Sequence, residues 1–234
     1  MQSAVPAFLR HLERERNASR HTIRAYAEDL AQFTGYSRHE LGREPRPEDL
    51  DHLLIRGFLA ELHRRGLKKV SSARKLAALR SFFRYLCREG WLQANPARLL
   101  LAPRREKRIP AVLDEAEVER ILELPGDGAA AVRGRAILEL LYATGMRCAE
   151  LVALDVPELD LDSRLVRVLG KGGKERIVLF GSRARDALRR WLEARASVQA
   201  RTEALFLNAR GGRLSDRSVR LLVARRVRQT ALAR

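Results

Sequence analysis

Apolar residues in the first part of the chain recur at the spacing of α-helices. Side chains three and four positions apart lie on one face of a helix, where they can pack against a neighbouring helix. Such faces are formed by Val5, Phe8, Leu9 and Leu12; by Ile23, Tyr26, Leu30 and Phe33; by the apolar positions of segment 47–62; and by Leu76, Leu79, Phe83 and Leu86. The pattern predicts a four-helix bundle over residues 1–95.

Local signals indicate where these helices begin and end. Ser19 can cap the second helix with its side-chain oxygen, and Pro47 suits the first turn of the third, which is expected to end at Gly66. The fourth helix is expected to begin near residues 71–72 and to run to about Arg88.

Beyond residue 110, helical and alternating patterns follow each other. Asp114 and Glu117 can form a capping box for a helix that continues to residue 124. A later helix is expected to end at Gly145 in a left-handed C-cap, and the next to cover 147–154.

A β-hairpin is predicted next, because β-branched and alternating residues over 164–169 and 176–180 flank the turn Gly170-Lys171-Gly172-Gly173-Lys174. The remaining elements are expected to be a helix over 182–196, a short strand over 204–207 and a final helix from Ser215. The fold class is therefore mainly α with a small antiparallel β-sheet.

A boundary between two domains is expected near the middle of the chain. Pro96, Pro103 and Pro110 surround the basic run 104–108, which is the composition of a linker. The sequence predicts a helical domain over 1–95, a linker over 96–110 and a mixed domain over 111–234.

The charge of the chain indicates a polyanionic partner. Lys and Arg total 46 against 29 Asp and Glu, and the net charge is +17. Binding to nucleic acid benefits from such an excess, because each neutralised phosphate releases counterions. Biased base composition of the genome could explain why Arg outnumbers Lys, but it does not explain the excess of basic over acidic residues.

The N-terminal segment and the cysteines argue against an exported or membrane protein. Residues 1–16 contain no long apolar core and become charged after Arg10, unlike a signal peptide or a membrane span. Cys87 and Cys148 lack the spacing of a zinc site or a disulfide framework. We expect a protein of the cytoplasm or nucleoid, with no membrane partner.

Two cations near the middle of the second domain are candidates for phosphate chemistry. Arg147 follows the helix break at Gly145 and falls in the first turn of the next helix, where free N–H groups and the helix dipole favour an anion. Lys171 projects from the predicted hairpin turn and could reach a phosphodiester. Taken singly, an arginine after a helix-breaking glycine is more often a solvated side chain, and a Lys/Gly turn is more often only a turn.

The order and spacing of TGMRCAEL, a β segment and GKGGKER resemble the tyrosine recombinases of the phage integrase family, particularly the Xer type. The runs SRHTIRAYAEDLAQF, SSARKLAALRSFFRYL and NPARLLLAPRREKRIPAVL are similar to the core-binding domain and linker of that family. The resemblance implies an N-terminal SAM-like domain that grips DNA and part of the α+β catalytic domain.

The resemblance also implies roles for particular residues. Arg147 would neutralise the scissile phosphate, Lys171 would protonate the leaving 5′-oxygen, and Glu150 would orient Arg147. The candidate DNA contacts, mostly to phosphates, are Arg24, Arg74, Lys75, Arg80 and Arg84. Covalent storage of the phosphodiester on tyrosine would require no cofactor and no metal.

Family members continue into a His-x-x-Arg box and a nucleophilic tyrosine, whereas the last histidine here is His63 and the tyrosines are Tyr26, Tyr36, Tyr85 and Tyr142. We therefore expect a C-terminally truncated recombinase that binds DNA without cleaving it alone. The alternatives are a naturally shortened, cleavage-dead relative and a helical transcription regulator. The implied partners are a double-stranded recombination site and a second recombinase protomer, in a tetramer on two DNA sites that serves Xer-type chromosome dimer resolution.

Overall fold

The computed structural model describes residues 1–234 apart from 2, 102–111, 124, 127, 171 and 231–234. The chain forms two compact units, Met1–Ile109 and Pro110–Arg234. Each unit has its own hydrophobic core, and between the units the linker predicted over 96–110 falls largely outside the described residues. The predicted domain limits therefore stay a prediction.

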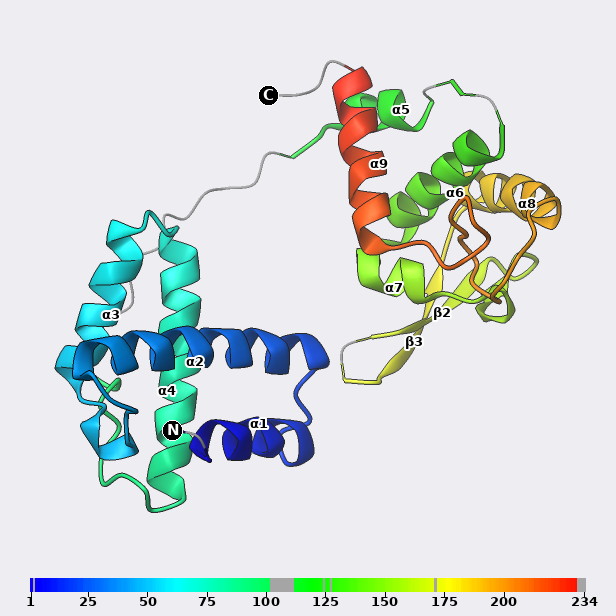
Figure 1. The fold of residues 1–234 in the computed structure, drawn as a ribbon. Helices are drawn as coiled ribbons and strands as arrows, with labels where there is room; N and C mark the ends of the chain where they lie inside the picture. Colours follow the sequence, from blue (N-terminus) through cyan, green and yellow to red (C-terminus); the bar gives the residue numbers. More distant parts are fainter. Residues whose placement is uncertain (2, 102–111, 124, 127, 171, 231–234) are drawn as a thin grey trace. The chain divides into compact units, whose positions relative to one another are not determined.

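The first unit is a helical bundle, as the apolar pattern predicted. Its long helices are α1 (Ala4–Arg14), α2 (Arg20–Leu41), α3 (His52–Arg64) and α4 (Lys69–Arg88) (Figure 1). Phenyl rings fill its centre, where Phe33 meets Phe58 and Phe83 edge to face. Aromatic pairs of this kind stabilise a core beyond the area that they bury. The predicted cap at Ser19 is confirmed, since its side chain accepts a hydrogen bond from Thr22 N.

Two helix starts in this unit differ from the prediction. Pro47 begins a separate 3-10 turn, Pro47–Asp49, instead of the first turn of α3. The helix begins only at His52, because the Asp51 carboxylate caps it by accepting from Leu54 N at 2.8 Å. Helix α4 begins at Lys69, earlier than predicted, because the Lys68 carbonyl already accepts from the N–H groups of residues 71 and 72.

A buried ion pair joins α2 to α4. Asp29 is only 1% exposed and accepts from Lys75 Nζ at 2.7 Å and from the Arg74 guanidinium. Lys75 is 4% exposed, so this residue, predicted from sequence as a DNA contact, is instead buried inside the bundle. Lys75 can be buried because the Asp29 carboxylate of α2 lies inside the bundle. This carboxylate replaces the water that would otherwise solvate the ammonium group.

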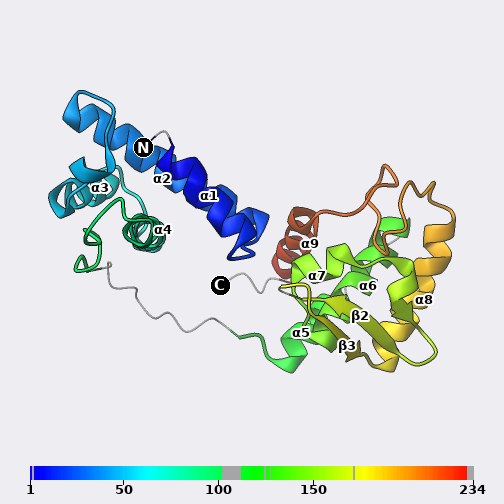
Figure 2. The ribbon, with the colours of Figure 1, turned by 90° about the horizontal axis from the view of Figure 1, so that it is seen from below.

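The second unit is built around α6. Its helices are α5 (Glu115–Leu122), α6 (Gly128–Thr144), α7 (Cys148–Ala153), α8 (Ser182–Ala196) and α9 (Asp216–Gln229). Helix α6 contacts the other four helices and strand β3 (Figure 2). This position explains why Ile137 and Leu140 of α6 are completely buried.

A three-stranded antiparallel sheet lies on the same core. Strands β1 (Leu159–Asp160), β2 (Leu165–Leu169) and β3 (Glu175–Leu179) occur in the order β1-β2-β3. Val166 and Val168 of β2 face the core, while Ile177 and Leu179 of β3 are exposed. The predicted hairpin is confirmed, and Gly172 and Gly173 adopt the positive φ angles that its turn requires.

Other predictions for this unit are confirmed in part. The capping box is present, with Glu117 N donating to Asp114 at 2.8 Å, although α5 ends at Leu122. The predicted strand over 204–207 was wrong. This buried segment forms single bridges to two different partners, Asp155 and Arg213, so it pairs with no continuous strand. None of the described helices combines the length and apolar composition needed to cross a membrane.

The buried pair predicts a large loss of stability on single substitution. Asp29→Ala should lower the free energy of unfolding of the first unit by about 3–5 kcal/mol, because Lys75 is left charged and buried. The double variant Asp29→Leu/Lys75→Met should recover most of that loss, since no buried charge remains and the half-exposed Arg74 can be solvated by water. Hydrogen exchange followed by mass spectrometry resolves the two units, and equal protection of α2 and α4 in Asp29→Ala and wild type would contradict the prediction.

Candidate functional site

Arg147 lies in the short connection between α6 and α7. Gly145 has φ +59° and donates its N–H to the Leu141 carbonyl at 2.9 Å, so the predicted left-handed end of α6 is confirmed. Arg147 is the N-cap of α7, one position before the predicted first turn. Its side chain is 71% exposed and can therefore meet a ligand from solvent.

A buried carboxylate fixes this arginine. Glu150 is only 6% exposed, and its Oε2 accepts from Arg147 N at 2.8 Å while its Oε1 accepts from Arg147 Nη1 at 2.9 Å. The same carboxylate accepts from Arg176 on β3, with Nη1 to Oε1 at 3.0 Å and Nη2 to Oε2 at 2.8 Å. One carboxylate thus holds two guanidinium groups from different elements.

The charges at this site are fixed over the physiological range. The hydrogen bonds from Arg176, followed by those from Arg147, lower the pKa of Glu150 from 4.5 to about 2 despite the opposing effect of burial. Glu150 also raises the pKa of Arg176. The cluster therefore carries one negative and two positive charges near pH 7, and its net positive charge favours an anion at Arg147.

The prediction from sequence missed Arg176, although a signal was present. Arg176 pairs with Val168 in the sheet, and Val168 faces the core. Side chains paired directly across two strands lie on the same face of the sheet. Arg176 therefore lies on the core-facing side of β3 with its side chain 40% exposed, and Glu150 is the acid of the neighbouring motif with which it pairs.

The opposite end of α7 is held by Arg213, which the sequence analysis also missed. Its Nη1 donates to the carbonyl oxygens of Val152 and Ala153 at 2.9 and 2.8 Å, and its Nη2 donates to Asp155. A cation at the C-terminus of a helix satisfies carbonyls that have no partner within the helix. Helix α7 is therefore fixed by arginine side chains at both ends.

The structure brings together Arg147 and Glu150, while the third residue of the predicted site, Lys171, lies outside the described residues. The preceding residue, Gly170, lies close to Arg176 and Glu150. A Cβ atom added there would lie 3.1 Å from Arg176 Nη1 and 3.8 Å from Glu150 Oε1. The turn end of the β2–β3 hairpin thus lies beside the cluster that holds Arg147.

The predicted DNA contacts of the first unit fall into three groups. Arg24 and Arg84 are exposed, and Arg74 is half exposed while it binds Asp29. Arg80 donates to the carbonyl of Ala97 at 3.1 Å and to that of Leu100, so it fastens the segment after α4 to the helix. Lys75 is buried on Asp29, as described above. A hollow of about 840 Å³ beside α4 is lined by Arg80, Arg84, Cys87, Gln93, Ala94, Asn95, Arg98 and Leu99.

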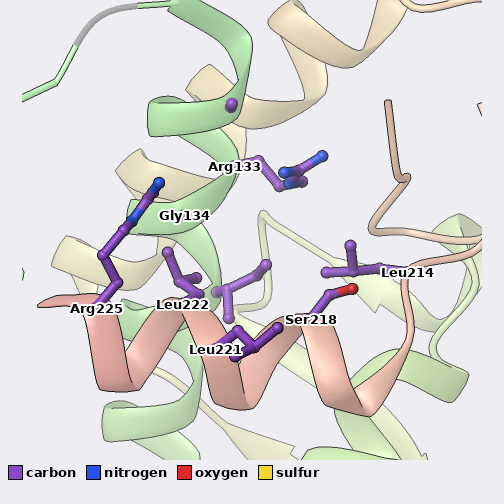
Figure 3. Close-up of a pocket in the computed structure, with 9 residues that line it drawn as sticks. Arg133, Gly134, Leu214, Ser218, Leu221, Leu222 and Arg225 are labelled. Carbon is purple, nitrogen blue, oxygen red and sulfur yellow. The ribbon is translucent and has the colours of Figure 1, made fainter. Parts of the chain in front are cut away.

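A second hollow lies between α6 and α9 (Figure 3). It measures about 330 Å³ and is lined by Ala130, Arg133, Gly134, Ile137, Leu214, Ser218, Leu221, Leu222 and Arg225. Its lining includes neither Arg147 nor Glu150, so this pocket is separate from the arginine cluster. Within the described part of the chain, no group of three or more His, Cys, Asp or Glu side chains could hold a metal ion.

The shared carboxylate makes the second unit sensitive to acid. Because folding lowers the pKa of Glu150, its contribution to stability is complete above pH 4.5 and is lost as the pH falls toward about 2. Glu150→Gln should lower the free energy of unfolding by about 1–3 kcal/mol near pH 7.

This difference from wild type should shrink in acid, as hydrogen exchange of the second unit at several pH values would measure. The control Glu193→Gln removes the same charge from the exposed surface of α8 and should change stability by less than about 0.5 kcal/mol. A difference between Glu150→Gln and wild type that persists at pH 2 would contradict the assignment.

Comparison with family models covers nearly the whole chain. The model of the phage integrase family matches residues 111–233, and that of the phage integrase N-terminal SAM-like domain matches residues 5–90. Tyrosine recombinase XerC of Pelobacter propionicus is 44% identical over 99% of this chain and 76% of its own length. XerC of Pelotomaculum thermopropionicum is 41% identical over 98% of this chain and 79% of its own length.

Solved structures share the fold at lower identity. XerH recombinase bound to a palindromic difH substrate superposes with a TM-score of 0.75 at 22% identity, over 98% of this chain and 69% of that protein. A lambda integrase tetramer bound to a Holliday junction gives 0.75 at 19%, over 100% of this chain and 64% of that protein. The resemblance seen in the sequence motifs is thus confirmed: the chain belongs to the phage integrase family, the tyrosine recombinases.

Proposed function

We propose that this chain acts in site-specific recombination of double-stranded DNA and that Arg147 binds the phosphate at which the strands are exchanged. The observation that carries the proposal is the contrast between two exposures. The Arg147 side chain is 71% exposed, whereas the carboxylate that holds it is 6% exposed. A guanidinium that a buried carboxylate holds in place, and that is otherwise exposed to solvent, is suited to bind an anion.

The chemistry of strand exchange gives this arrangement a purpose. Attack on a phosphodiester builds negative charge on the non-bridging oxygens, and donors that are already in place stabilise that charge without reorganisation. A guanidinium has five N–H donors, and Arg147 uses one Nη1 donor on Glu150. Its remaining donors are available to phosphate oxygens.

The remaining catalytic roles rest on the family resemblance. Lys171, which falls between β2 and β3 in the sequence, would protonate the 5′-oxygen as it leaves, and a tyrosine would hold the 3′-phosphate. Tyr26, Tyr36 and Tyr85 pack against the core of the first unit. Tyr142 on α6 is 58% exposed but precedes Arg147 by five residues, whereas the family places its nucleophile after the His-x-x-Arg box. We therefore propose that none of these four tyrosines attacks the DNA.

The first unit would supply most of the affinity for DNA. Arg24 on α2 and Arg84 on α4 are exposed, and Arg74 can offer the donors that Asp29 leaves free. The burial of Lys75 argues against a direct contact from this residue. The relatives named XerC suggest a role in resolving chromosome dimers, in the cytoplasm on the nucleoid.

A second recombinase protomer is the expected protein partner. The solved lambda integrase tetramer is bound to a Holliday junction, and that protein shares its fold with this chain. By analogy we propose that protomers of this chain, or of this chain and a related recombinase, assemble on paired DNA sites.

Binding to duplex DNA should weaken steeply with salt, because each phosphate contact releases counterions. Fluorescence anisotropy with a short duplex measures this dependence. Arg84→Gln should reduce the slope of log Kd against log salt by about 1. The matched control is Arg64→Gln on α3, which removes the same charge from a residue paired with Glu61. Equal effects of the two variants would show that net charge, and not a contact at Arg84, determines the binding.

The chemical step should need residues that this chain does not contain. Incubated with a suicide substrate, the 234-residue chain should bind DNA without forming a covalent band on a denaturing gel. A chimera that carries the family's His-x-x-Arg and tyrosine segment after Arg234 should form the band.

In the chimera, Arg147→Gln should lower cleavage by about 10²–10³-fold, as loss of an oxyanion-stabilising donor does elsewhere. Its DNA affinity should fall by less than about tenfold, because one contact among many is lost. A 5′-thiol leaving group, which needs no proton, should rescue Lys171→Ala in part. A covalent band from the unextended chain would overturn the proposal that none of the four tyrosines attacks the DNA.

A further inference from the structure

The geometry points to Arg176 as a positioning residue, which holds Glu150 beside the turn end of the β2–β3 hairpin and thereby fixes Arg147. This inference rests on the proposed contact between Arg147 and phosphate. It assigns to Arg176 a role that acts through Arg147 and not on DNA directly.

The contacts of Glu150 are divided unequally between the two arginines. Arg176 binds the carboxylate with both Nη atoms, at 3.0 and 2.8 Å, in the parallel arrangement that gives the firmest arginine–carboxylate pairing. The Arg147 side chain uses Nη1 alone, at 2.9 Å. If the Arg147 guanidinium turns from Glu150 to a phosphate, Glu150 therefore stays in place. Its carboxylate still accepts hydrogen bonds from Arg176 and from the Arg147 backbone N–H.

Without Arg176 the carboxylate would have one guanidinium partner instead of two. A bound phosphate and Glu150 would then compete for the same guanidinium, and the buried carboxylate would lose hydrogen bonds whenever the phosphate won. Since a buried charge strongly disfavours such a loss, Arg147 would be held back from the ligand. Arg176 removes this competition.

The hairpin takes part in the same contact. Gly170 N donates to the Lys174 carbonyl at 2.8 Å and closes the end of the hairpin beside the cluster. A Cβ atom at position 170 would lie 3.1 Å from Arg176 Nη1 and 3.2 Å from the Lys174 carbonyl oxygen, which is tighter than side chains normally pack. Arg176 thus lies between the Glu150 carboxylate and the hairpin backbone, and joins α7 to the hairpin.

A double-mutant cycle on the 234-residue chain tests the inference. Duplex affinity is measured by anisotropy for wild type, Arg147→Gln, Arg176→Gln and the double variant. If Arg176 acts through Arg147, each single variant should raise Kd by about three- to tenfold, and the double variant should raise it no further than Arg147→Gln. Effects that multiply in the double variant would overturn the inference, because they would show an independent DNA contact.

A charge-matched control separates positioning from net charge. Arg167 lies on β2 opposite Ile177, on the exposed face of the same sheet. Combined with Arg147→Gln, Arg167→Gln should give effects that multiply, unlike Arg176→Gln. Arg176→Lys keeps the charge but not the two-pronged geometry, so its affinity should lie between those of wild type and Arg176→Gln. It also replaces Arg176→Gln in the cycle should the latter fail to fold.

A second readout does not depend on DNA. The pKa of Glu150 is followed by carbon-detected NMR, and it should rise markedly in Arg176→Gln, less in Arg176→Lys and not at all in Arg167→Gln. An unchanged titration in Arg176→Gln would overturn the inference. If Arg147→Gln leaves DNA affinity unchanged while the Glu150 titration responds as expected, the proposed phosphate contact fails and the hold of Arg176 on Glu150 stands.

Discussion

One carboxylate accepts hydrogen bonds from two arginines that lie 29 positions apart in the sequence, and the second unit is arranged so that they can meet there. Glu150 is buried at the start of α7, Arg147 caps that helix, and Arg176 reaches it from β3. A buried carboxylate is costly unless it is fully paired. This requirement constrains α7 and the hairpin together, so neither can shift without leaving a charge unsatisfied.

The first unit contains an analogous device with a different outcome. Asp29 is also nearly inaccessible and also binds two cations, Arg74 and Lys75. There the two cations are neighbours on α4, and Lys75 is buried with the acid. Arg74 is half exposed, and in the second unit both cations reach solvent, with the Arg147 side chain 71% and the Arg176 side chain 40% exposed. The burial of Lys75 therefore distinguishes the ion pair that joins two helices from the cluster at α7.

Periodicity was sufficient to predict most of the fold from the sequence. The helices of the first unit, the end of α6 at Gly145, the hairpin and α8 follow from local spacing and from glycine, which is why each was found. The errors concern elements that depend on distant partners. Asp51 caps α3 in place of Pro47, Asp29 draws Lys75 inward, and the segment 204–207 pairs with two separate stretches.

The candidate site was predictable to a similar extent. Arg147 and Glu150 share one motif, and the turn between them is local, so the sequence was enough to place them together. Arg176 and Arg213 were missed because their partners are 26 and about 60 positions away. The pairing of β2 with β3 places Arg176 on the same face of the sheet as Val168, whereas Arg213 lies in a loop and carries no comparable pattern.

The capping of α7 by Arg213 has a consequence for the order in which parts of the protein fold during synthesis. Helix α7 has six residues, too few to be stable alone. Arg213 is synthesised about 60 residues after the carbonyls that it caps. While the chain leaves the ribosome, the first unit can complete its core, whereas the helix that begins beside Arg147 waits for the loop that precedes α9. We therefore expect the nascent protein to complete its bundle before the helix that begins beside Arg147 is capped.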